Sequence, residues 1–107
     1  MADTITKEEL KAEIETGGSL LLLDVRDTPD YEKEHIVGAV HLLIADMEEQ
    51  RVKALAHPDD LVVVYSQDNR CPAKFIAAEK LRGFGFSNVK AYPGSWKEWK
   101  EAGFPTE

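Results

Sequence analysis

The chain has one cysteine, Cys71, among 107 residues, which excludes an internal disulfide. A fold that does without disulfides is typical of a reducing compartment. The amino terminus carries neither the basic nor the apolar segment of a secretory signal. No apolar run approaches the roughly 18 residues that a membrane-spanning helix needs. These absences predict a cytoplasmic protein with no membrane partner.

Basic charge is also scarce, with 13 Lys and Arg residues against 20 Asp and Glu residues and a net charge of −7. This balance argues against a nucleic-acid partner, which requires a basic face. Arg70 and Lys74 are the candidates for a local positive spot. Only three histidines occur, His35, His41 and His57, and their positions give no metal-ligand spacing. We therefore expect neither a metal nor a cofactor.

The remaining composition, 43% hydrophobic and 31% charged, is that of an ordinary globular protein. A chain of this length corresponds to one domain, which we expect to span residues 1–107 without internal repeats or linkers. Helices and strands are predicted to alternate, which indicates an α/β fold with a mostly parallel sheet. Strands are expected over residues 19–25, 61–65 and 89–92, with a weakly extended segment over 36–43.

Helices are predicted between these strands. Thr6 and Glu9 form a capping box that starts the first helix, and Gly17 ends it. Further helices are expected from Thr28 to about residue 35, and over residues 46–55, 72–84 and 94–102. In the 72–84 helix, the residues that recur at three- and four-residue steps are Phe75, Ala78, Leu81 and Arg82.

The segment between the 61–65 strand and the following helix is the strongest candidate site. Backbone amides at the start of a helix are unpaired and favour a negative charge at the end of the preceding strand. The candidate anion-binding residues are those of this loop: Gln67, Asp68, Asn69, Arg70 and Cys71. Within it, Arg70 is a potential anion donor, whereas Asp68 would repel an anion unless it turned outward.

Two residues of this loop decide its chemistry, Ser66 at the first position and Cys71 at the last. A serine nucleophile needs a base, and no histidine lies near Ser66 in the sequence, so a loop hydrogen bond is the favoured role of its hydroxyl. Cys71 precedes Pro72 at the start of a helix, where a thiol is more acidic than usual. The alternative for Cys71 is an inert, partly buried side chain.

Four segments, in this order, resemble the rhodanese-like domain family: residues 22–27 with Tyr31, residues 34–40, residues 62–73, and residues 94–105. The second resembles a His-Ile-Pro-Gly-Ala signature, with Val37 in place of proline. The fourth resembles a Gly-Gly-x-x-x-Trp segment, with Ser95 in place of the second glycine. The loop is similar to a family variant that reads Tyr-Cys-x-x-x-x-Cys-Pro-Ala.

The resemblance implies a central, mostly parallel sheet of about five strands with helices on both faces. It also implies transfer of sulfane sulfur, from donors such as thiosulfate to cyanide or a protein thiol, through a persulfide on the first loop residue. Ser66 stands at that position, so turnover is expected to be weak or absent unless Cys71 carries the sulfur. Asp24 and Arg26 are expected to shape the loops, and His35 to act as a structural hydrogen bonder.

A second function class stays open from the sequence. With Ser66 at the sulfur-carrying position, the domain is alternatively a non-catalytic module that binds an anion or a protein partner. A cysteine phosphatase or arsenate reductase is disfavoured, because both need a cysteine at the strand end and an arginine closing the loop, and neither Ser66 nor Cys71 fits.

Overall fold

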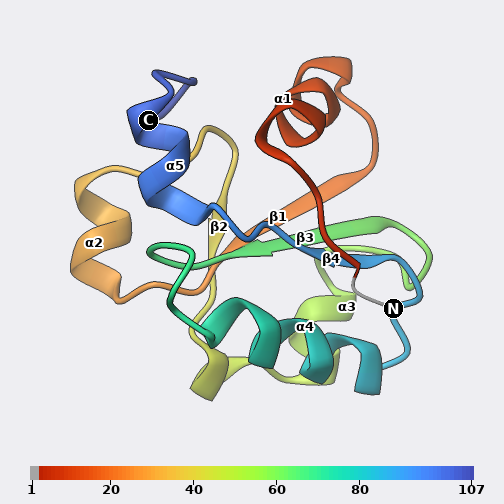
Figure 1. Ribbon diagram of the computed structural model, residues 1–107. Helices are drawn as coiled ribbons and strands as arrows, with labels where there is room; N and C mark the ends of the chain where they lie inside the picture. The colour runs from red at the N-terminus through yellow and green to blue at the C-terminus, as the bar shows by residue number, and fades with distance from the viewer. Residues whose placement is uncertain (1–2) are drawn as a thin grey trace.

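The computed structural model describes residues 3–107 and is built on a parallel sheet in the order β2-β1-β3-β4 (Figure 1). The strands are β1 (Leu20–Asp24), β2 (Val40–His41), β3 (Leu61–Tyr65) and β4 (Val89–Ala91). β1 and β3 pair along their full length, from Leu20 opposite Leu61 to Asp24 opposite Tyr65. The two central strands therefore end side by side, and the loops that follow them leave the sheet at the same edge.

The sheet has four strands rather than the five that the resemblance implied. At the outer edge of β4, where a fifth strand would pair, Thr4 and Ala91 form a single parallel bridge. Two hydrogen bonds make this contact, from the Ile5 amide to Ala91 O at 3.1 Å and from the Ala91 amide to Asp3 O at 2.9 Å. The capping box at Thr6 starts a helix immediately afterwards, so the chain cannot extend along β4.

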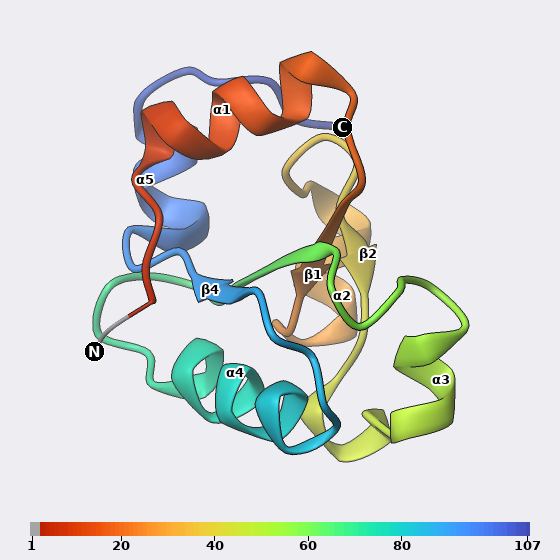
Figure 2. The same cartoon turned by 90° about the vertical axis from the view of Figure 1, so that its right-hand side faces the viewer.

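Helices lie on both faces of the sheet, as expected (Figures 1 and 2). Their bounds are α1 (Lys7–Thr16), α2 (Thr28–Lys33), α3 (Glu49–Lys53), α4 (Ala73–Gly83) and α5 (Ser95–Glu101). The helix predicted over residues 46–55 is instead a 3-10 turn, η1 (Ile44–Asp46), followed by the short α3, with Met47 extended between them. No helix in the range 3–107 has both the length and the apolar character needed to cross a membrane.

Two clusters of apolar side chains hold these layers together, one on each face of the sheet. Leu21, Leu23, Val62 and Val64 face α3 and α4, whereas Leu22, Val63 and Tyr65 face α1 and α5. This alternation is why both central strands are nearly continuous apolar runs, since each residue has a helix to cover it. The sheet edge that carries the candidate loop is thereby fixed from both sides.

The buried face of α4 does not include Phe75, the first residue of the helical repeat in the sequence. The side chain of Phe75 is 45% exposed and that of Ile76 is 55% exposed, whereas Lys74, Ala77, Ala78 and Leu81 are buried. The two alanines let the helix approach the sheet closely, and the large side chains are turned outward. Lys74, rather than Phe75, therefore points inward from the first turn of α4, below the candidate loop.

Candidate functional site

The first residue of the candidate loop, Ser66, is buried and held by three groups. Its amide donates to Ser95 Oγ at 3.2 Å, and its carbonyl accepts from the Trp96 amide at 3.1 Å. Its hydroxyl donates to Cys71 O at 3.3 Å, which is the loop hydrogen bond favoured for this side chain from the sequence. The fold thus brings Ser66 and Cys71, the two ends of the loop, into contact.

Ser95 binds the start of the loop and itself has an unusual backbone conformation. Its φ of 61° lies in the left-handed region, which favours glycine. The buried hydroxyl accepts from the Ser66 amide and donates to Tyr92 O at 3.0 Å. The sequence showed Ser95 only as a replacement for a glycine, and its role as a clamp on Ser66 emerges from the structure.

The middle of the loop is closed by Asp68, whose Oδ1 accepts from the Arg70 amide at 3.0 Å and from the Cys71 amide at 3.1 Å. This corrects the expectation that the amides of residues 67–71 together ring an external anion. Two of those amides are already bound to a carboxylate of the loop itself, because a short Asp side chain readily bonds amides two and three residues ahead.

Lys74 supports the loop from below. Its buried ammonium donates to Cys71 O at 2.6 Å and to Asp68 O at 2.9 Å, and burial lowers the pKa of Lys74. Arg70 points away and is exposed. The surface spot of positive charge predicted from Arg70 and Lys74 therefore does not form, because Lys74 is directed into the protein to satisfy loop carbonyls.

The Cys71 thiol lies beside several polar groups of the loop, which act on its pKa. Burial raises the pKa of this thiol, but the neighbouring Ala73 amide, Ser66 hydroxyl and Gln67 amide and the charge of Lys74 outweigh the effect of burial. The net effect is a pKa below the ordinary value, as predicted for a cysteine at a helix start. The side chain is only partly buried, so the thiol is open to reagents.

A cleft of about 410 Å³ opens over this thiol. Its walls come from the ends of β1 and β3 and from the starts of α2 and α4. The lining residues are Val25, Arg26, Asp27, Asp30, Ser66, Gln67, Cys71 and Ala73. The cleft is thus formed by the two loops that leave the same edge of the sheet.

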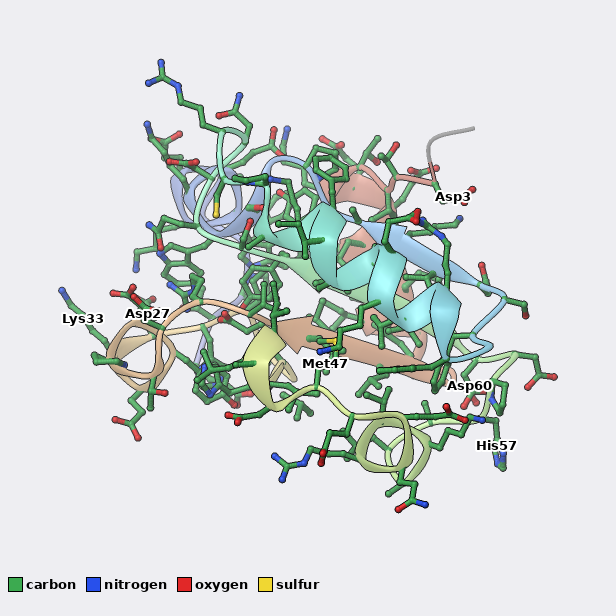
Figure 3. The ribbon with its side chains drawn as sticks, turned by 90° about the horizontal axis from the view of Figure 1, so that it is seen from below. Asp3, Asp27, Lys33, Met47, His57 and Asp60 are labelled. Atoms are coloured by element: carbon green, nitrogen blue, oxygen red, sulfur yellow. The ribbon has the colours of Figure 1, made fainter. Side chains whose placement is uncertain are left out.

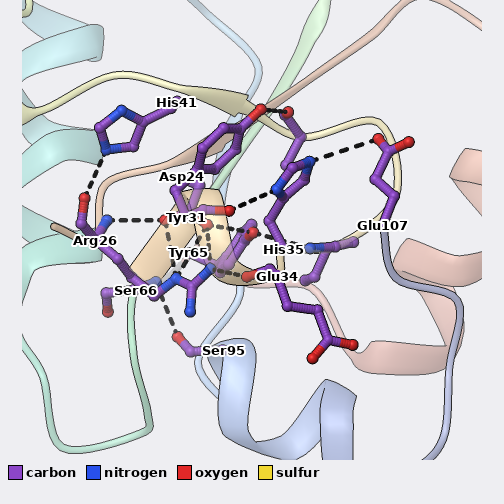
Figure 4. A network of polar contacts seen from close by, with 12 residues as sticks. Asp24, Arg26, Tyr31, Glu34, His35, His41, Tyr65, Ser66, Ser95 and Glu107 are labelled. Atoms are coloured by element: carbon purple, nitrogen blue, oxygen red, sulfur yellow. Dashed lines mark hydrogen bonds and ion pairs between the residues drawn. The ribbon is translucent and has the colours of Figure 1, made fainter. Parts of the chain in front are cut away.

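The wall from β1 is fixed by a buried ion pair between Asp24 and Arg26 (Figure 4). Arg26 Nη2 donates to Asp24 Oδ2 at 2.8 Å and to Glu34 O at 2.7 Å, and its guanidinium lies 4.6 Å from the ring centre of Trp96. The expected contact between Asp24 and Arg26 is therefore present. Its geometry uses most of the guanidinium donors inside the protein.

Tyr65 completes this network and was not recognised as a polar anchor from the sequence. Its hydroxyl donates to Asp24 Oδ2 at 2.6 Å and accepts from the Ile36 amide at 3.2 Å. Burial, reinforced by the negative charge of Asp24, raises the pKa of Tyr65 well above its usual range. The only available signal was its place as the last residue of a buried strand, opposite Asp24.

The histidines lie outside the cleft. His35 Nδ1 is 2.8 Å from Tyr31 O, and the two rings stack at 3.9 Å, so His35 is a structural hydrogen bonder as expected (Figure 4). His41 Nε2 is 2.7 Å from Arg26 O, and His57 lies exposed in a turn. No histidine lines the cleft beside Ser66. Within residues 3–107, no three His, Cys, Asp or Glu side chains are grouped to hold a metal.

Comparison with known proteins places this geometry in a family. The sequence model of the rhodanese-like domain family matches residues 6–102 of this chain. The chain is 34% identical over 81 residues to the thiosulfate sulfurtransferase GlpE of Coxiella burnetii, which covers 76% of this chain and 72% of that protein. It is 30% identical over 95 residues to the putative sulfur carrier protein YrkF of Bacillus subtilis, covering 89% of this chain but 49% of that protein. The chain therefore spans about half the length of some relatives.

Solved structures agree with the family match. The Alr3790 protein from Anabaena superimposes with a TM-score of 0.85 at 31% identity, covering 96% of this chain and 90% of that one. The BH2092 protein from Bacillus halodurans shares the fold with a TM-score of 0.91 at 24% identity, covering 99% of this chain and 77% of that one. The matched residues include both central strands, the loop and the flanking helices. The chain is a member of the rhodanese-like domain family.

Proposed function

We propose that this domain carries and transfers sulfane sulfur, with Cys71 rather than the first loop residue as the sulfur carrier. The observation that carries the proposal is the position of the Cys71 thiol, partly exposed in the cleft, with a lowered pKa. The sulfur chemistry in the printed names of YrkF and GlpE supports it. A thiol needs a reducing compartment such as the cytoplasm to stay available, and that location is part of the proposal.

The first step is attack of the Cys71 thiolate on the outer sulfur of a donor. With thiosulfate, a new S–S bond forms to Cys71, the old S–S bond breaks, and sulfite leaves with the electron pair. In the second step an acceptor thiolate or cyanide attacks the outer sulfur of the Cys71 persulfide. The bond between the two sulfurs breaks, and the Cys71 thiolate leaves with its electrons. No oxidant is consumed, and the donors around Cys71 stabilise both anionic forms.

Ser66 contributes to this site as a hydrogen-bond donor and not as a nucleophile. Its hydroxyl already bonds to Cys71 O, and it lies close enough to the thiol to help lower the thiol pKa. No histidine lines the cleft to take its proton. This arrangement assigns the reactive anion to the only sulfur of the loop.

Intact-mass analysis after incubation with thiosulfate, and separately with cysteine persulfide, tests the proposal. We expect a gain of one sulfur atom that is reversed by cyanide with release of thiocyanate, and that is lost in Cys71→Ala. Ser66→Ala is the matched control, because it removes a neighbouring polar group and should keep measurable loading. A wild-type protein that gains no mass from either donor would contradict the proposal and favour a non-catalytic binding module.

A further inference from the structure

The charges lining the cleft over Cys71 are not those of an anion site. Asp27 and Asp30 both line it, both are exposed, and neither forms an ion pair in the described part of the chain. Arg26, the one cation in the lining, is neutralised by Asp24, which it meets through three contacts of 2.8 to 3.1 Å. These two carboxylates, at the start of α2, therefore set the sign of the charge that a substrate meets.

The neighbouring charges do not reverse this sign. Lys74 and Asp68 carry opposite charges and both bind the loop itself, the ammonium to loop carbonyls and the carboxylate to loop amides. Lys33 and Lys100 line the adjacent hollow, where Lys100 pairs with Glu34. Arg70 is exposed, and none of these three cations lines the cleft itself. The net charge of −7 adds a weaker repulsion of anions over the whole surface.

We propose that Asp27 and Asp30 are specificity-determining residues, which make the cleft select sulfur compounds with positive charge near the reacting sulfur and discriminate against dianions such as thiosulfate. This inference rests on the proposed function, because it names the substrate class of the same thiol. The cleft over Cys71 therefore differs from a site built for thiosulfate, because the two negative charges of thiosulfate would have to approach two carboxylates. A thiol or persulfide flanked by lysine or arginine is the chemistry that fits.

Two methanethiosulfonate reagents of opposite charge test this selection directly, one with a trimethylammonium group and one with a sulfonate group. In both, the Cys71 thiolate attacks the sulfenyl sulfur, a disulfide forms, and methanesulfinate leaves with the electron pair. The ratio of the two rates, cation over anion, is measured on the folded protein and divided by the same ratio for 2-mercaptoethanol. The reagents modify any accessible thiolate, so the measurement needs no sulfur-transfer activity.

We expect a normalised ratio of roughly three to ten in the wild-type protein, because two solvent-exposed carboxylates attract the cationic reagent and repel the anionic one. In the double variant Asp27→Asn with Asp30→Asn it should fall close to one. The matched control, Glu13→Gln with Asp59→Asn, also removes two negative charges, one from α1 and one from the turn before β3. It should keep the wild-type ratio. Figure 3 shows Asp27 at one end of the molecule and Asp60, next to Asp59, at the other.

The possible outcomes separate the two proposals. A wild-type ratio near one, or a double variant that behaves like the wild-type protein, would overturn the selection by Asp27 and Asp30. An equal fall in the control variant would assign the effect to net charge and overturn it as well. If the ratios behave as expected but no donor adds sulfur to Cys71, only the sulfur-transfer proposal fails. If both hold, the double variant should load faster from thiosulfate, with a smaller gain from zwitterionic cysteine persulfide.

Discussion

The loops after β1 and β3 leave the same edge of the sheet, yet they use charge in opposite ways. At the end of β1, Asp24 and Arg26 are buried, and their polar atoms bond to each other, to Tyr65 and to the backbone (Figure 4). After β3, the loop satisfies its own amides with Asp68 and its carbonyls with Lys74, and leaves the Cys71 thiol partly exposed. One loop is a fixed wall, and the other presents a reactive group.

This difference indicates how a small domain builds a cleft. The rigid side is held by a complete buried ion pair. Removing one partner of such a pair is strongly destabilising, because the other charge is left buried without compensation. The reactive side is made of polar groups that lower the pKa of one thiol without enclosing it. Substitutions in the buried ion pair should therefore lower stability, and substitutions in the second loop should change thiol reactivity.

Asp24→Asn should have the largest effect, because it leaves the buried Arg26 charge without its partner. We expect a loss of about 3–5 kcal/mol in the free energy of unfolding, measured by urea denaturation. Asp27→Asn makes the same chemical change at an exposed position three residues later and should cost less than about 0.5 kcal/mol. Equal losses in the two variants would show that the β1 wall does not depend on its ion pair.

Ser95→Ala tests the clamp that joins α5 to the start of the β3 loop. It removes the acceptor of the buried Ser66 amide and keeps the left-handed backbone, so a loss of about 1–3 kcal/mol is expected. Ser95→Gly removes the same hydroxyl but relieves the backbone, and should be more stable than Ser95→Ala by about 1 kcal/mol. A glycine variant as unstable as the alanine variant would show that the φ of 61° stores no strain.

Lys74→Met should act on reactivity, since its charge helps to lower the pKa of the Cys71 thiol. Without this charge the pKa rises, so the midpoint of the pH profile of alkylation by iodoacetamide moves to higher pH. At pH 7 the rate should fall by about three- to ten-fold, as for loss of a nearby opposite charge. Lys80→Met on the same helix is the control, because Lys80 bonds to Ile44 O and should leave the profile unchanged.

Arg70→Ala should have the smallest effect, although Arg70 was the candidate anion donor of the loop. The side chain is exposed and does not line the cleft, so the change in unfolding free energy should stay within about 0.5 kcal/mol. Sulfur loading from thiosulfate should also remain within about two-fold of the wild-type rate. A ten-fold loss of loading would show that Arg70 reaches the substrate and would weaken the contrast between the loops.

Local patterns were enough to predict much of the fold. The capping box at Thr6, the apolar run at residues 61–65 and the glycine that ends α1 each specify a feature by contacts within a few residues. The same holds for the acidic character of Cys71, which follows from its place at a helix start. The expected number of strands and the single helix over residues 46–55 were wrong, because both depend on how segments distant in sequence pack.

The sequence by itself determined the α/β class, the rhodanese-like order of segments and the loop with serine at one end and cysteine at the other. Only the tertiary structure decided which charges reach the thiol. It buried Lys74 and exposed Arg70, turned Asp68 onto the loop amides, and brought Asp27 and Asp30 to the cleft. These choices depend on side-chain direction and on the meeting of two loops about forty residues apart. Neither can be predicted from the local periodicity of the sequence.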